Sequence, residues 1–335
     1  MRIILIILLC LPFLANAQIT PVDSTTNNVP SLKVIQSIRP TFFEFKYNGV
    51  RDYPMRLSSE EFGDSQAEVS NNRRLRFKLN VPLTFNRKLR LALGLSYAHE
   101  QFRFENIQDA DYPLYDRLED KSLRSVGMRF YLKRDLSNGK FIKSRFGVDL
   151  NGDKITAIGF SRFFKGNISV VYGRQKDAYT EIGFGLYAGY DLGIPSIFPV
   201  FNYNKILSTR WMMELVLPRS AKIIYTPNPK TQFNSRIEVS GGSYHMQEEV
   251  LPGFSNLELR QSELRFLIGM NREVYDFLWA SVGIGALRNL NFFVSERRQR
   301  RSDAIITASP FTAYTVEFTV YLVPPRKLYN KALGQ

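Results

Sequence analysis

Strict alternation of apolar and polar residues over long segments constrains this chain more than any other feature of its sequence. From Arg74 to Phe85 every second residue is apolar, and Arg, Lys, Asn, Pro and Thr fill the positions between. The same pattern runs from Leu89 to Ala98, after a short connection at 86–88. A period of two is that of an extended strand with one apolar and one polar face. The two segments therefore predict a hairpin of long strands.

Alternation returns along the rest of the chain, with Gly, Asn and Pro at the expected turns. The further apolar series run from Val126 to Leu132, Ile182 to Ala188, Leu264 to Met270, Leu278 to Ile284 and Tyr314 to Leu322. We find no convincing amphipathic helix of any length. The sequence therefore predicts an all-β fold.

The lengths of strands and connections favour a membrane barrel. The predicted strands exceed the ~5–6 residues usual in soluble sheets. Connections at 86–88, 137–139 and 271–276 are short, whereas those at 48–72, 106–121, 247–256 and 295–309 are long and polar. Short periplasmic turns and long outer loops give this asymmetry in outer-membrane barrels. We predict a transmembrane antiparallel up-and-down β-barrel of about 12–14 strands, with an even number if both termini are periplasmic.

Composition agrees with a lipid-facing barrel. Aromatic residues make up 13% of the chain, yet the mean hydropathy is only −0.20. This pairing is expected when every second strand residue faces lipid. Aromatic residues near strand ends are typical of interfacial girdles. The candidates are Phe42, Phe43, Phe45, Tyr47, Phe163, Phe164, Phe292 and Phe293. The structural alternative is a soluble β-sandwich or lipocalin-like barrel, which would also alternate.

The N-terminus predicts export. Arg2 precedes an apolar run from Ile3 to Leu14, and residues 15–17 form a small-x-small cleavage site. The lone cysteine, Cys10, lies inside this signal peptide, so the mature chain has no thiol chemistry. We expect cleavage near Ala17 and location in the outer membrane of a Gram-negative bacterium. The predicted parts are a signal peptide (1–17), a flexible periplasmic segment (18–32), the barrel (33–323) and a periplasmic tail (324–335).

The formal net charge of +14 suits contact with polyanions. In an exported chain these are lipopolysaccharide phosphates, anionic lipids or anionic solutes, and nucleic acid is not an expected partner. The expected partners are outer-membrane lipids, lipopolysaccharide and the outer-membrane assembly machinery. No cofactor is predicted.

If the apolar faces meet lipid, the polar faces line the lumen. The predicted basic lining residues are Arg74, Arg76, Lys78, Arg90, Arg129, Lys133 and Arg265, and the acidic ones are Glu100, Glu214, Glu238 and Glu317. One interpretation is a narrow barrel filled by ion pairs, because isolated buried charges are too costly to persist. The other is a basic, water-filled channel that favours anions.

Catalysis has one weak candidate. Ser96 and His99 are three residues apart and would face opposite sides of a strand, whereas Ser243 and His245 are two apart and share a face. Some lipid-hydrolysing outer-membrane barrels keep a serine and a histidine together, although in the order His-x-Ser. Glu248 or Glu249 could orient the ring. A histidine near an interfacial loop is the simpler interpretation, and we expect no enzyme activity.

Charged clusters in the predicted loops complete the candidates. Acidic groups at 60–64 and 109–120 resemble no calcium-loop motif, so no metal site is predicted. A basic cluster in the last loop could clamp lipopolysaccharide phosphates, although simple solvation is the more economical reading. It consists of Arg297, Arg298, Arg300 and Arg301. Phosphate-loop, CxxC, HExxH and GxSxG motifs are absent from the sequence.

Four features together resemble a family of outer-membrane β-barrels of unknown function. They are the signal peptide, the hairpin at 74–104, the segment at 212–225 with Leu217-Pro218-Arg219, and the run Gly241-Gly242-Ser243-Tyr244. The resemblance implies a barrel fold and an outer-membrane location, and no activity. The chain departs from the simplest barrels in ending on a tail after Pro324 and Pro325 instead of on an aromatic residue.

These observations predict an outer-membrane barrel with small-solute passage that favours anions, or with a structural or lipopolysaccharide-binding role. The alternatives are a lipid hydrolase using Ser243 and His245 and, third, a soluble exported β-rich binding protein.

Overall fold

The computed structural model of the protein describes residues 39–85, 88–109, 112–120, 122–155, 160–246, 251–254, 256–297 and 299–333. The predicted signal peptide and the segment at 18–32 lie outside these residues, as do Arg298, Glu248 and Glu249. The side chains of 85, 160 and 331–333 are also outside the description.

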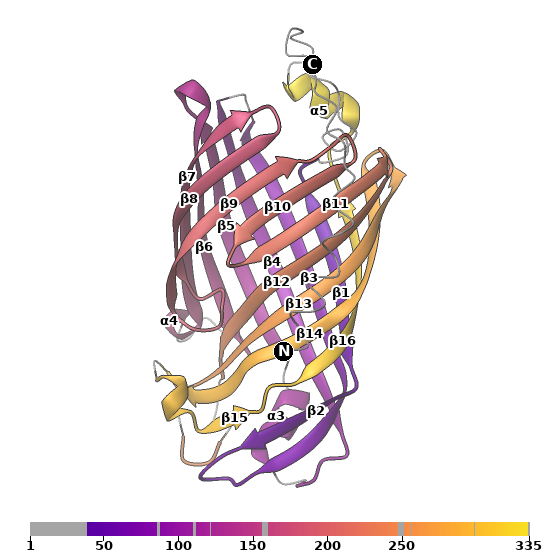
Figure 1. The fold of residues 1–335 in the computed structure, drawn as a ribbon. Helices are drawn as coiled ribbons and strands as arrows, with labels where there is room; N and C mark the ends of the chain where they lie inside the picture. Colours follow the sequence, from indigo (N-terminus) through magenta and orange to yellow (C-terminus); the bar gives the residue numbers. More distant parts are fainter. Residues whose placement is uncertain are drawn as a thin grey trace, which may run out of the picture.

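The described chain is built mainly from long strands joined in hairpins (Figure 1). The strands are β1 (Phe43–Arg51), β2 (Tyr53–Ser58), β3 (Ser65–Phe85), β4 (Leu89–Glu105), β5 (Leu123–Asp135), β6 (Lys140–Gly152), β7 (Phe164–Asp177), β8 (Thr180–Gly189), β9 (Ser196–Ile206), β10 (Trp211–Leu217), β11 (Ser220–Asn228), β12 (Thr231–His245), β13 (Leu257–Tyr275), β14 (Leu278–Glu296), β15 (Ile306–Ala308) and β16 (Thr312–Leu322). The helical elements are α3 (Pro113–Asp120), η2 (Ser137–Gly139), α4 (Phe160–Phe163), η3 (Arg301–Asp303) and α5 (Arg326–Leu333).

Strand β1 closes the sheet into a barrel because it pairs with β3 on one side and with β16 on the other. Phe45, for example, lies opposite Phe77 of β3 and opposite Val320 of β16. Within the described residues, 14 antiparallel strands form the ring, and β2 and β15 lie outside it. The predicted fold class is confirmed, and the strand number is at the upper limit of the expected range. Most of the stretch from 135 to 190 belongs to β6, β7 and β8, which take part in the hairpins β5–β6 and β7–β8.

The two ends of the barrel differ as the connection lengths predicted. Helix α5 lies at one end, which we call the turn end, and β2, β15 and α3 lie at the other, which we call the loop end (Figure 1). Turns at 136–139 and 276–277 belong to the turn end. The last of these is shorter than predicted, because β13 continues to Tyr275 and β14 begins at Leu278.

The long loop-end connections are more structured than their polar composition suggested. The segment 48–72 contains the end of β1, all of β2 and the start of β3, and 106–121 and 295–309 contain α3 and β15. The expectation of no helix is therefore wrong for α3 and α5, each of eight residues. Their short amphipathic patterns are stabilised by packing at the barrel ends, a tertiary effect that overrides weak local propensity. No helix of the described ranges is long and apolar enough to span a membrane.

Strand β4 shows how the two faces change polarity along one strand. In its first part Leu95 and Tyr97 point outward and are exposed, while Ser96 points into the lumen. Beyond residue 99 the pattern inverts, because Phe102 and Phe104 are buried inside and polar residues alternate with them on the outside. The apolar exterior therefore ends before the loop end, and an apolar interior begins there.

A hydrophobic core fills the lumen at the loop end. Tyr53 of β2 stacks on Phe311 with ring centroids 4.2 Å apart, and Tyr115 of α3 donates a hydrogen bond to the backbone oxygen of Met55 (3.2 Å). Burial raises the pKa of Tyr112, beside α3, to about 12, so its phenol stays neutral. We call this assembly of β2, α3, β15 and the inward side chains around them the plug.

The hairpin β10–β11 is shorter than its neighbours and turns back partway along the barrel (Figure 1). Residues 196–200 of β9 consequently have no partner in β10, and residues 239–245 of β12 have none in the β11 ladder. The segment 190–195 turns inward at this interruption of the wall. Its Gly193 lies against Gln261 and Gly242, at a positive φ of 81° that glycine tolerates.

Part of the aromatic-girdle prediction is wrong. Phe163, Phe292 and Phe293 are between 0% and 2% exposed and therefore belong to the interior. Phe292 packs in the plug, and Phe163 lies against His245. Sequence position near a strand end did not distinguish the interfacial exterior from this second, inner apolar region.

Candidate functional site: the barrel lumen

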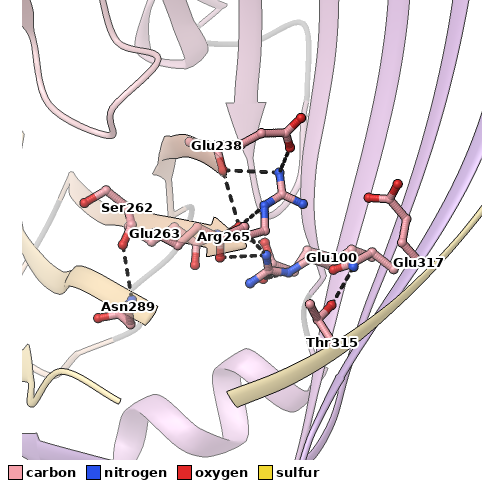
Figure 2. Close-up of polar contacts among 12 residues, drawn as sticks. Glu100, Glu238, Ser262, Glu263, Arg265, Asn289, Thr315 and Glu317 are labelled. Carbon is pink, nitrogen blue, oxygen red and sulfur yellow. Dashed lines mark hydrogen bonds and ion pairs between the residues drawn. The ribbon is translucent and has the colours of Figure 1, made fainter. Parts of the chain in front are cut away.

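The lumen between the plug and the turn end is lined by charged side chains from opposite walls. Arg74 of β3 donates to Glu263 of β13 at 2.7 Å and lies 3.0 Å from Glu100 of β4. Arg265 lies between Glu263 and Glu238, at 3.3 and 3.7 Å (Figure 2). Strands far apart around the ring are therefore linked across the lumen.

A second chain of ion pairs continues this layer toward β1 and β16. Arg236 of β12 lies 2.5 Å from Glu317 and 3.2 Å from Glu238, and Lys46 of β1 lies 3.2 Å from Glu317. We call the whole group the central ion-pair layer, and its positive and negative side chains are equal in number. Its members are Lys46, Arg74, Glu100, Arg236, Glu238, Glu263, Arg265 and Glu317. Neutral pairing offsets the cost of burying each charge.

Apart from Arg76, the remaining predicted lining residues also lie in ion pairs, mostly with acidic residues that the sequence analysis did not select. Arg129 binds Asp149 (2.6 Å), and Lys133 binds Glu181 (2.6 Å). The other pairs are Lys78 with Glu44, Arg90 with Asp135 and Glu214 with Lys222. Arg76 lines a small pocket of about 90 Å³ beside the central layer.

The missed carboxylates differ in how far the sequence could have revealed them. Glu181 precedes the outward residues Ile182 and Phe184, so strict alternation assigns it to the lumen. Glu263 likewise shares the face of Arg265. Asp191 lies in the segment 190–195 outside any strand, and no periodic signal indicates its position.

The turn-end half of the lumen contains a cavity of about 720 Å³. Val171, Tyr187 and Val200 form an apolar cluster on its wall, with Phe198 and Val216 packed against it. Four basic residues also line it, Lys133, Lys143, Arg145 and Arg219, as do Leu328 and Tyr329 of α5. The polar lumen expected from alternation is therefore incomplete on this side of the barrel, where inward positions carry apolar residues.

Ser243 and His245 do not form a hydrogen-bonded pair among the interactions of the described residues. The Ser243 hydroxyl donates to Glu258 (3.2 Å), which also binds Lys165 (2.7 Å). The His245 ring packs against Phe163 with centroids 5.2 Å apart. Both side chains are buried, at 0% and 2% exposure. This geometry gives the hydrolase interpretation no support, because a serine nucleophile needs a base within hydrogen-bond reach and access to substrate.

The loop-end basic cluster contributes to a pocket of about 550 Å³ that also contains Lys165 and Arg260. Arg297, Arg300 and Arg301 line it, as do the apolar side chains Ile194 and Pro195. Among the described residues, no group of three or more His, Cys, Asp or Glu side chains is arranged to hold a metal ion.

The barrel exterior carries a continuous apolar surface that meets the requirements of a membrane. Ile268, Ile284 and Val316 lie side by side on β13, β14 and β16 and are 55%, 62% and 40% exposed. An exterior of this kind around a closed barrel is what lipid requires, because apolar side chains face outward and strand ladders pair the backbone around the ring, apart from the interruption between β9 and β12. Bacterial outer-membrane barrels of a single chain have an even number of strands, as this ring of 14 does. The chain is thus an outer-membrane β-barrel, and the soluble alternative does not account for its exterior.

Comparison with known proteins gives one family match. The model of a domain of unknown function, DUF6268, matches residues 15–299. No curated protein matches the chain.

Distant likenesses among solved structures include outer-membrane channels and porins. The COG4313 outer membrane channel from Pseudomonas putida F1 has a TM-score of 0.39 and 9% identity, covering 90% of this chain and 100% of that one. The P. putida toluene transporter TodX has a TM-score of 0.35 and 7% identity, with coverage of 88% and 93%. The KdgM porin, solved with oligogalacturonate, has a TM-score of 0.33 and 7% identity, with coverage of 83% and 98%. These likenesses are too distant to carry a solute over to this chain.

Proposed function

The chain belongs to the family of the domain of unknown function DUF6268, and we propose that it passes small solutes across the outer membrane through a lumen that the described conformation holds closed. The observation that carries this proposal is the width of the barrel. About eight strands already give an interior that side chains can just fill, and this ring has 14. The surplus space is occupied by the plug, the central ion-pair layer and the cavity of about 720 Å³.

The lumen is closed by side chains and connections of the chain itself, namely the plug and the central ion-pair layer. Such groups can move, so a closed state of this kind is able to open. Arg74 and Glu263 form the shortest link between β3 and β13 in the central layer. Replacing both by Gln removes one charge of each sign, so the net charge of the lumen is unchanged. We expect the wild type to conduct rarely in planar bilayers and the Arg74→Gln/Glu263→Gln variant to open more often.

The control variant removes the same two charges from the exterior. Arg73→Gln/Glu105→Gln changes exposed positions of β3 and β4 and should leave conductance at the wild-type level. Continued silence of the lumen variant, with correct folding shown by heat-modifiable migration, would contradict solute passage through this route.

Anion preference is the finer part of this proposal. Arg76, Lys78 and Arg90 lie along the lumen side of β3 and β4. Lys78 and Arg90 pair with Glu44 and Asp135, and the three side chains together bring one more positive than negative charge to this part of the lumen. Rings of basic residues favour anions in pores. Changing these three residues to Glu should reverse the selectivity of any open state, as measured by the reversal potential in a salt gradient. An unchanged reversal potential would remove the anion assignment.

Lipopolysaccharide contact is proposed for the loop-end pocket. Five cations line this pocket with one carboxylate, Glu258, and Arg side chains bind phosphate with paired hydrogen bonds. An Arg300→Gln/Arg301→Gln variant should bind vesicles containing phosphorylated lipid A more weakly than the wild type does. Equal binding to vesicles with and without the phosphates would refute this role.

Export follows from the N-terminal sequence, and the outer-membrane assembly machinery is the expected insertion route. The predicted mature chain begins at Gln18. The intact mass of the protein purified from outer membranes gives the first residue of the mature chain directly. A mass that includes residues 1–17 would contradict the predicted cleavage.

A further inference from the structure

The cavity in the turn-end half of the lumen has the lining of a binding site for an apolar group. Val171, Phe198, Val200 and Val216 come from β7, β9 and β10 and turn their side chains inward. Water-filled barrel interiors are polar, whereas concave apolar pockets of about 300–1,000 Å³ are typical of small-molecule sites. At about 720 Å³ this cavity falls within that range. Its wall is therefore suited to a hydrocarbon occupant and poorly suited to water alone.

Positive charge is in excess directly beside this apolar wall, since Lys143 of β6 pairs with Val171 of β7. Lys133 and Lys143 both bind Glu181, at 2.6 and 2.7 Å. Both ammonium groups also lie over the Phe141 ring, at 5.1 and 4.8 Å from its centroid. Lys133 also lies 3.9 Å from Asp135, which pairs with Arg90 at 3.6 Å. Three cations thus share two carboxylates in a partly buried place, where one more anion would complete the pairing.

Arg145 and Arg219 repeat this arrangement nearer the middle of the barrel. Both bind Asp191, at 2.5 and 3.1 Å. Here two cations share one carboxylate, and this group also borders the cavity. The cavity therefore combines an apolar wall with two sites at which cations outnumber carboxylates.

We propose that this cavity binds a single-chain amphiphile with an anionic headgroup, such as a long-chain carboxylic acid. Its chain lies against Val171, Val200 and Val216, and its headgroup binds Lys143 and its neighbour Arg145. This assignment rests on the proposed lumen passage and names the class of solute that the lumen accepts.

The barrel wall offers this ligand a route that avoids the central ion-pair layer. The tip of β10–β11 at Leu217 and Arg219 lines the cavity, and so does Leu192 of the segment 190–195. These residues stand at the interruption of the wall between β9 and β12. Ile194 of the same segment and Ile197 at the start of β9 are 40% and 80% exposed. An amphiphile can therefore exchange between the cavity and the bilayer once the 190–195 segment moves.

The test is a binding titration with the full mature protein in lipid nanodiscs. The probe is cis-parinaric acid, a fluorescent long-chain carboxylic acid, and its methyl ester is the matched probe without the negative charge. Empty nanodiscs give the background from partition into lipid. We expect saturable binding of the acid at one site and an affinity for the ester at least about tenfold lower, which is a difference of about 1.4 kcal/mol.

Two pairs of variants separate the chain site from the headgroup site. Val171→Trp fills the cavity and should abolish binding of both probes, whereas Val170→Trp changes the adjacent lipid-facing position and should leave binding intact. Lys143→Gln leaves the neutral pair Lys133–Glu181. It should weaken binding of the acid probe without weakening binding of the ester probe. Lys46→Gln is the control for Lys143→Gln. It also removes one of two cations that share a carboxylate, leaving the pair Arg236–Glu317, but it lies outside the cavity.

Each result decides a different part of the proposal. No saturable binding by the folded wild type, or binding that Val171→Trp leaves unchanged, would overturn the cavity as a site. Equal affinities for acid and ester would overturn the anionic headgroup. Neither binding result depends on conductance. Solute passage can therefore fail in planar bilayers while amphiphile binding holds, and amphiphile binding can fail while solute passage holds.

Discussion

At the residue scale, the interior charges of this barrel are held by partners from distant strands. Arg74 is the clearest case, because it contacts Glu100 and Glu263 and its side chain is only 19% exposed. Removing it leaves two carboxylates close together without their shared cation.

We predict that Arg74→Ala lowers the free energy of unfolding by about 3–5 kcal/mol, the usual cost of breaking a buried pair. Lys78→Ala, at a more exposed pair with Glu44, should cost at most about 1 kcal/mol. Urea unfolding in lipid vesicles, followed by tryptophan fluorescence, measures both. Similar losses for the two variants would mean that the central layer does not depend on Arg74.

Ser243 is the residue for which a structural and a catalytic role make opposite predictions. Because its buried hydroxyl donates to Glu258, Ser243→Ala should destabilise the barrel by about 1–2 kcal/mol. Wild type and variant should hydrolyse phospholipid at the same background rate. Calcium-independent and calcium-supplemented lipase assays on folded protein check this, and activity that the substitution abolishes would restore the hydrolase interpretation.

At the element scale, the interruption of the wall depends on a close approach between two backbones. A Cβ atom at Gly241 would lie 2.5 Å from the carbonyl carbon of Leu192 and 2.7 Å from the backbone nitrogen of Gly193. Glycine at 241 therefore allows the 190–195 segment to pack against β12.

Gly241→Ala should push the 190–195 segment away from β12 at a cost of about 1–3 kcal/mol. Limited proteolysis of the protein in nanodiscs should then cut within 190–195 faster than in the wild type. Gly166→Ala on β7, where the nearest atom to the added Cβ is 3.5 Å away, is the matched control. Equal cleavage of all three proteins would show that this contact does not hold the segment.

At the scale of the whole molecule, the decisive property is the apolar exterior. Ile284 is 62% exposed in the middle of the apolar surface, and Tyr275 is 63% exposed at the turn end. The two positions expose similar areas at different expected depths in a bilayer.

Ile284→Arg should destabilise the protein in lipid vesicles by about 2–4 kcal/mol, because arginine near the membrane midplane loses its hydration. Tyr275→Arg, near the interface, should cost about 0–1 kcal/mol. Urea unfolding in vesicles compares the two. Equal effects would place the membrane elsewhere along the barrel.

Much of the barrel wall could be predicted from alternation, because facing direction along a strand is a local property of the backbone. The outward series at Leu95 and Tyr97, and the inward position of Arg74, follow from it. The plug could not be found in this way, since Phe102 and Phe104 continue the polar face of β4 and look like an error of pattern until α3 and β2 are in place. The cavity could not be predicted either, because Val171 and Val200 break the rule that inward residues are polar.

The sequence by itself determined the fold class and the outward faces of the clearest strands, both of which depend on spacing between neighbours. Only the tertiary structure decided which interior groups meet. Arg74 and Glu263 are 189 residues apart and lie 2.7 Å from each other only because β1 closes the ring. Asp191 reaches Arg145 and Arg219 because a short hairpin leaves space for its segment to turn inward. Contacts of this kind depend on ring closure and on the packing of connections, and no period in the sequence encodes them.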